Sequence, residues 1–125
     1  MQNKINSLKL RMKDNNVDLV VLGPGTHMNW LLGFNPYPDE RPCMLLIGKE
    51  KEAFLMPSVN AEDARKRTDI AINSWNDENG PDQALKEALL YIGESSAKHI
   101  AIDEAMRSHF ALIVIEALPN PTYEF

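Results

Sequence analysis

Short runs of apolar residues alternate along this chain with stretches whose apolar positions recur at helical spacing. The run Leu-Val-Val-Leu at residues 19–22 is continuous and partly β-branched, which is typical of a strand covered on both faces. The runs at 43–47 and 53–56 are of the same kind, and the polar connection at 49–51 is short enough for an antiparallel hairpin. The alternation predicts an α/β domain with three layers, in which a mixed sheet has helices on both faces.

Residues that start and end helices divide the stretches between these runs. The first predicted helix has Ile5, Leu8 and Met12 at spacings of three and four. Residues 110–118 contain β-branched side chains, but their length and the proline that follows favour a buried helix. In chain order, the predicted elements are helix 4–14, strand 18–23, a short helix 27–32, strands 43–48 and 52–57, helix 61–67, strand 69–75, helix 81–92, strand 98–103, helix 110–118 and a last strand from 122.

The composition is that of a single globular domain. The chain has 125 residues, of which 44% are hydrophobic and 25% are charged, so one core is expected. The net charge is −5 and the basic residues do not cluster densely, which argues against nucleic acid as a partner. No apolar run is long enough to span a bilayer, and the amino terminus lacks the apolar core of a secretory signal, so we expect a cytoplasmic protein without a membrane contact.

The residue types that carry chemistry are scattered. His27, His99 and His109 fall in three different predicted elements, and none belongs to a metal-binding motif. The serines lack a Gly-x-Ser-x-Gly elbow, and the turn at 23–26 lacks the glycine spacing and the lysine of a phosphate-binding loop. Cys43 lies within an apolar run, where we expect a small buried hydrophobe. The sequence therefore predicts no catalytic residue, no metal ligand and no cofactor within this chain.

The segment 31–47 separates a buried scaffold from a displayed loop more clearly than any other part of the chain. An apolar stretch ends at Gly33 and is followed at 34–42 by three prolines, two acids and Arg41, after which the next apolar run begins. Prolines lack the N–H that a strand ladder needs, so the loop is predicted to be mostly extended and at the surface. The adjacent acids Asp39 and Glu40 are expected to be solvated.

Five short segments together resemble a known family. They are residues 5–12, 16–21, 29–34, 41–47 and 54–57, and the last ends in a proline. These segments resemble the amino-terminal domain of the Xaa-Pro peptidase family, which includes aminopeptidase P, prolidase and creatinase. Within 29–34 the matching positions are Asn29, Leu31, Gly33 and Phe34, whereas Trp30 and Leu32 depart from the commonest family residues.

The resemblance implies both a fold and a role. The fold would be a ribonuclease H-like motif. Residues 1–125 would be the N-terminal, non-catalytic domain of a Xaa-Pro metallopeptidase, inactive alone and supporting a homodimer. A C-terminal catalytic domain of the pita-bread type, absent from this chain, would hold two divalent metals, often manganese, through two aspartates, one histidine and two glutamates. In such sites the two metals activate a bridging water. The substrate would be a proline-containing peptide.

The resemblance also implies that residues 34–41 line the rim of an active site. The candidates for contact with the substrate are Phe34, Tyr37 and Arg41, since an aromatic ring can exclude solvent and an arginine can pair with a carboxylate through a bidentate fork. We expect Arg41→Ala to raise the Michaelis constant for short substrates more than it changes the stability of the fold.

Two other functions fit the same residues. One is a stand-alone α/β module that binds a small ligand or a protein partner without any peptidase domain. The other is the corresponding domain of a creatinase-type hydrolase, which would use the same scaffold on a different substrate. The reading frame beyond Phe125 separates the first of these from the peptidase hypothesis.

Overall fold

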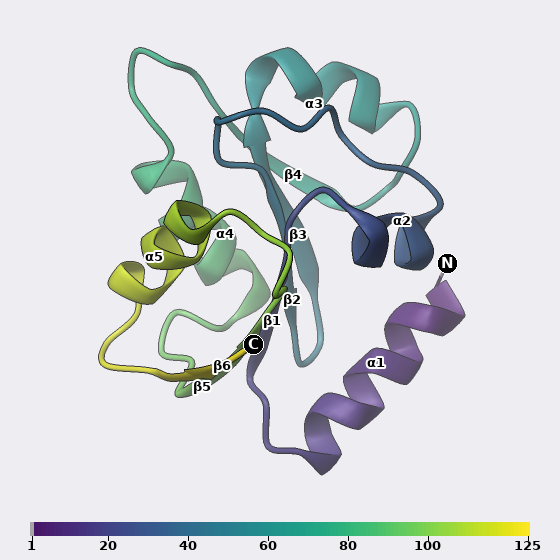
Figure 1. Ribbon diagram of the computed structural model, residues 1–125, viewed down its shortest axis with the longest axis vertical. Helices are drawn as coiled ribbons and strands as arrows, with labels where there is room; N and C mark the ends of the chain where they lie inside the picture. Colours follow the sequence, from purple (N-terminus) through teal and green to yellow (C-terminus); the bar gives the residue numbers. More distant parts are fainter. Residues whose placement is uncertain (1) are drawn as a thin grey trace.

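The computed structural model describes residues 2–125 and contains one six-stranded sheet with helices on both sides (Figure 1). The helices and strands occur along the chain in the predicted order. The elements are α1 (Gln2–Asp14), β1 (Leu19–Leu22), α2 (Thr26–Leu32), β2 (Met44–Gly48), β3 (Glu52–Pro57), α3 (Ser58–Arg65), β4 (Ala71–Trp75), α4 (Asp82–Ile92), β5 (His99–Ile102), α5 (Ser108–Ala117) and β6 (Thr122–Glu124).

The strands lie in the order β4-β3-β2-β1-β5-β6. Strand β2 pairs antiparallel with both β1 and β3, and all the other neighbours are parallel. The hairpin of β2 and β3 predicted from the two apolar runs is therefore confirmed, and so is the mixed sheet. Because β2 alone runs in the opposite direction, β1, β3, β4 and β5 all end at the edge of the sheet where β2 begins.

The two faces of the sheet bury separate hydrophobic clusters. In β1, Leu19 and Val21 face the cluster beneath α4 and α5, whereas Val20 and Leu22 face the one beneath α1, α2 and α3. All four residues are buried, which confirms the strand predicted to be covered on both faces. The three-layer arrangement follows from this alternation, and Figure 1 shows the two helical layers on opposite sides of the strands.

Most boundaries agree with the sequence prediction, and the ambiguous segment 110–118 is helical, as expected. Gly93 has a φ of 79° and ends α4 in the left-handed conformation that favours glycine. The helix predicted for 61–67 is displaced, because it begins at Ser58 directly after β3. The Ser58 hydroxyl donates to the carbonyl of Trp75 at 3.0 Å instead of capping a later helix start.

Cys43 is the small buried hydrophobe that the sequence predicted, at 3% exposure. Burial raises the pKa of its thiol to about 12, with a further contribution from the negative charge of Asp39. The thiol therefore stays protonated near neutral pH. Separately, no helix within residues 2–125 has both the length and the apolar character needed to cross a bilayer.

A polar cluster joins three elements at the edge of the sheet where β1 begins. The Asp18 carboxylate accepts from the backbone N–H of Lys98 at 2.8 Å and from the Nζ of Lys49 at 3.1 Å. Lys49 also donates to Glu94, which is 6% exposed, at 3.3 Å. Partial burial raises the pKa of Asp18, but these hydrogen bonds outweigh it and hold the pKa below 3.8. The hydrogen bond to Asp18 raises the pKa of Lys49 above 10.5.

The Asp18 carboxylate is expected to stabilise the fold in a pH-dependent way. A lowered pKa in the folded state means that this stabilisation is present above pH 3.8 and is lost as the pH falls through the folded-state pKa. Asp18→Asn should therefore lower the free energy of unfolding by about 1–2 kcal/mol at neutral pH and by much less in acid. Urea unfolding at about pH 7 and about pH 3 measures this difference.

Asp69→Asn is the matched control, because Asp69 is an exposed aspartate outside the cluster. It should change stability little at either pH. An Asp18→Asn effect of equal size at both pH values would contradict a role for the ionised carboxylate. Lys49 affects stability at alkaline pH. Because its pKa is raised in the folded state, its contribution to stability is present below pH 10.5 and is lost as the pH rises through the folded-state pKa.

Candidate functional site

Most of the loops that could display chemistry lie at one edge of the sheet, which we call the carboxyl edge. It comprises the loop residues 23–25, 34–43, 76–80 and 103–107, which follow β1, precede β2 and follow β4 and β5, respectively, together with the first residues of α3, which follow β3 directly. In open α/β sheets, ligands bind outside the carboxyl ends of the strands, because loops from several strands converge there. The segment 34–42, named the rim loop below, crosses this edge.

Arg41 is held by carboxylates of this chain. Its Nε and Nη2 atoms donate to the two carboxylate oxygens of Asp77, at 3.1 and 3.2 Å, in a bidentate fork. Asp39 accepts from the backbone N–H of Arg41 at 2.8 Å and lies 3.7 Å from Nη1. Asp39 therefore orders the loop and is not only a solvated acid. The guanidinium of Arg41, which we expected to pair with a substrate carboxylate, pairs with Asp77 in this structure.

The residues on either side of Arg41 are anchored too. The Glu40 carbonyl accepts from Nε2 of His109 at 3.1 Å, and the Pro42 carbonyl accepts from Nε1 of Trp75 at 2.9 Å. Three consecutive residues of the rim loop are thus fixed by three different elements: α5, the turn after β4, and β4 itself. This end of the loop is preorganised before any ligand arrives.

The other end of the rim loop is divided between core and surface. Phe34 is 8% exposed and packs against Phe54, with ring centroids 6.3 Å apart, so it is a core residue of the domain. Asn35 accepts from the Gly25 N–H at 3.0 Å. Tyr37 is 74% exposed. The loop lacks regular structure, as predicted. It is less exposed than predicted, because some of its side chains pack beside the core. Of the three candidates for substrate contact, Tyr37 is the one that the loop exposes most.

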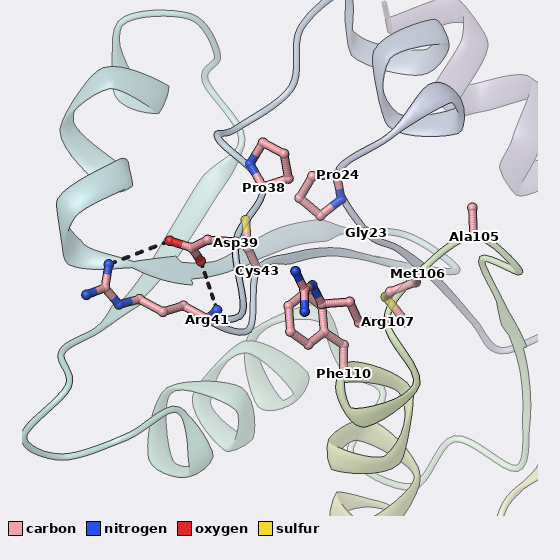
Figure 2. A pocket seen from close by; sticks show the side chains of 10 residues that line it. All are labelled: Gly23, Pro24, Pro38, Asp39, Arg41, Cys43, Ala105, Met106, Arg107 and Phe110. Carbon is pink, nitrogen blue, oxygen red and sulfur yellow. Dashed lines mark hydrogen bonds and ion pairs between the residues drawn. The ribbon is translucent and has the colours of Figure 1, made fainter.

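A pocket of about 150 Å³ lies between the rim loop and the start of α5 (Figure 2). Arg107 points into this space, whereas the guanidinium of Arg41 is turned away from it. Only Asp39 contributes a carboxylate to the wall. The lining residues are Gly23, Pro24, Pro38, Asp39, Arg41, Cys43, Ala105, Met106, Arg107 and Phe110.

Asp103 connects two of the turns at the carboxyl edge. It is 6% exposed and follows β5, where its two oxygens accept from the backbone N–H groups of Gly23, at 3.2 Å, and Ala105, at 2.9 Å. His27 lies 4.0 Å from it. Asp103 therefore joins the turns after β1 and β5, which both line the pocket, so that the pocket wall depends on a buried carboxylate.

Sequence reasoning did not single out Trp75, Asp77, Asp103 or Arg107 as site residues. An aspartate directly after an apolar strand is a signal that could have found Asp103. The pairing of Asp77 with Arg41 has no such signal, because the two residues are 36 positions apart on loops that only the fold brings together.

The potential metal ligands among the described residues are dispersed. Within residues 2–125, no group of three or more His, Cys, Asp or Glu side chains is placed to hold a metal ion. His27, His99 and His109 lie in α2, β5 and α5, respectively, so they come from three different elements.

Solved structures share this fold over almost the whole chain. The creatinase/prolidase N-terminal domain of an X-Pro dipeptidase from Streptococcus pyogenes has a TM-score of 0.87 at 16% identity, over 99% of this chain and 93% of that one. A dipeptidase from Pyrococcus horikoshii OT3 has a TM-score of 0.83 at 22% identity, over 97% of this chain and 33% of that one. A prolidase from Thermococcus sibiricus has a TM-score of 0.80 at 16% identity, over 98% of this chain and 34% of that one.

The chain therefore spans about a third of the length of the last two proteins. No curated protein sequence matches it significantly. Residues 4–124 match the family profile described as the creatinase/prolidase N-terminal domain. With nearly every residue matched and the same fold observed, this chain belongs to the creatinase/prolidase N-terminal domain family.

Proposed function

We propose that this chain is the non-catalytic N-terminal domain of a Xaa-Pro dipeptidase and that its rim loop forms part of the wall of an active site built by another domain. The observation that carries this proposal is the anchored rim loop, on a domain whose fold matches N-terminal domains of X-Pro dipeptidases. A loop held at three consecutive residues can present a nearby side chain at a lower ordering cost on binding.

Tyr37 is the side chain that this loop presents. At 74% exposure it contacts solvent over most of its surface, and an aromatic ring at the mouth of a site excludes water from a short substrate. Arg41 acts mainly through its fork with Asp77, which fixes the direction of the loop. Strand β6 runs parallel to β5, so residue 125 lies towards the carboxyl edge, and a following domain would begin on the side of the molecule that carries the rim loop.

The chemistry of peptide hydrolysis is proposed to lie outside residues 1–125. The two divalent metals expected for this family, with manganese as the first candidate, would be bound by a C-terminal catalytic domain, since the side chains of the described residues do not fit them. A homodimer and a cytoplasmic location belong to the same proposal. In such a dimer, the rim loop of one subunit could serve the active site of its partner.

Arg41→Ala tests the rim role in the longer protein. Loss of the fork should raise KM for short Xaa-Pro substrates about three- to tenfold, with a smaller change in kcat, because the wall is misplaced but the hydrolytic groups are not. The free energy of unfolding should fall by no more than about 1 kcal/mol, since partly exposed ion pairs contribute little. Steady-state kinetics and urea unfolding measure the two effects.

Arg67→Ala is the matched control. Arg67 also pairs with an aspartate, Asp63, at 3.2 Å, but on α3 and outside the rim loop. Its removal should leave KM unchanged. If Arg41→Ala and Arg67→Ala gave the same kinetics as the unmodified protein, the rim loop would not form part of the active site.

A further inference from the structure

Arg107 is an exposed side chain at the pocket of Figure 2, and its charge is not paired with a carboxylate of the described residues. Among residues 2–125, no carboxylate forms an ion pair with it, whereas Arg41 is paired with both Asp77 and Asp39. Asp39 is the one acid that lines the pocket, and it is already engaged by the backbone and side chain of Arg41. Figure 2 shows the guanidinium of Arg107 directed into the pocket, so this charge faces space that a ligand could fill.

Several apolar side chains line the rest of the pocket, and the space is small. Pro24, Pro38, Met106 and Phe110 supply apolar surface. The Cys43 thiol, with its pKa raised to about 12, stays neutral there. A volume of about 150 Å³ is below the range of about 300–1,000 Å³ that holds drug-sized ligands, so the occupant must be compact.

We propose that this pocket is a binding site for a small carboxylate with a compact apolar body. Arg107 would donate to the carboxylate through its planar fork, the geometry in which guanidinium groups bind carboxylates most strongly. The apolar body would lie against Pro24 and Phe110. The site belongs to this chain alone, so it requires neither a catalytic domain nor peptidase activity, and it can fail or hold independently of the function proposed above.

Cyclopentanecarboxylate and its uncharged analogue cyclopentanecarboxamide test the proposal on the 125-residue chain. Nuclear magnetic resonance titration at low ionic strength should show saturable shifts at the backbone amides of residues 105–107 with the carboxylate. The amide should bind at least tenfold more weakly. Acetate, which lacks the apolar body, should also bind more weakly than cyclopentanecarboxylate.

Two arginine variants separate a pocket from a general charge effect. Arg107→Gln should weaken carboxylate binding at least tenfold, and Arg107→Lys should weaken it less because the charge is kept. Arg65→Gln removes an exposed arginine from α3 and should leave binding unchanged. The backbone spectrum of each variant shows whether it remains folded.

Three results would overturn the proposal. The first is the absence of saturable shifts with cyclopentanecarboxylate up to its solubility limit. The second is equal binding by folded Arg107→Gln and the unmodified chain. The third is equal weakening by Arg107→Gln and Arg65→Gln, which would show non-specific attraction to positive charge.

Discussion

Replacing Trp75 by alanine is expected to lower the free energy of unfolding by about 3–5 kcal/mol, a large share of the stability of a domain this size. Trp75 is 8% exposed and belongs to the cluster beneath α4 and α5. Its indole N–H also donates to the Pro42 carbonyl at 2.9 Å. The substitution leaves a cavity in the core and an unpaired carbonyl at the base of the rim loop.

Trp75→Phe separates the two contributions. It keeps most of the buried ring but removes the donor to Pro42, so we expect a loss of about 1–3 kcal/mol, the range for an unpaired buried polar group. Urea unfolding followed by circular dichroism measures the loss. Because Pro42 closes the rim loop, the phenylalanine variant should also increase hydrogen exchange at the backbone N–H of Arg41, which donates to Asp39.

Trp30 provides the matched control, because it is the other tryptophan and is 63% exposed. Its ring contacts Lys4, whose Nζ lies 4.5 Å from the ring centroid, so Trp30→Ala should cost no more than about 1 kcal/mol. Equal losses for Trp30→Ala and Trp75→Ala would contradict the assignment of Trp75 as the link between the core and the rim loop.

The layers of the fold could be predicted from sequence because each depends on local patterns. The continuous run at 19–22 predicted a strand with two buried faces, and the alternation of strands with helical stretches predicted helices on both sides of the sheet. The helix at 110–118 was recoverable from its length and its terminal proline, despite β-branched residues. These features need no knowledge of which residues meet in space.

The site was less accessible to sequence reasoning, because its geometry depends on contacts between distant loops. Tyr37 was predicted as a displayed residue and is exposed. Phe34 was grouped with it, although its ring packs in the core against Phe54, since an aromatic residue next to a glycine carries no signal of the direction it faces. The fork of Arg41 depends on Asp77, which is placed by the turn after β4. Such a pairing follows only from the strand order.

The second large effect that the proposed function predicts is that peptidase activity requires sequence outside this chain. The fold positions a rim loop but brings no three potential metal ligands of residues 2–125 together. Xaa-Pro hydrolysis by the family chemistry requires such ligands, so we expect the 125-residue chain alone to be inactive. A longer product of the same reading frame, if it carries two aspartates, one histidine and two glutamates in a further domain, should be active.

Proline release from a Xaa-Pro dipeptide in the presence of manganese shows whether residues 1–125 hydrolyse such a substrate without a further domain. The assay compares the purified 125-residue chain with the product of the complete reading frame. We expect no metal-dependent release from the 125-residue chain and clear release from the longer protein. Metal-dependent hydrolysis by residues 1–125 alone, or a reading frame that stops after Phe125, would contradict the assignment of this chain as the N-terminal domain of a Xaa-Pro dipeptidase.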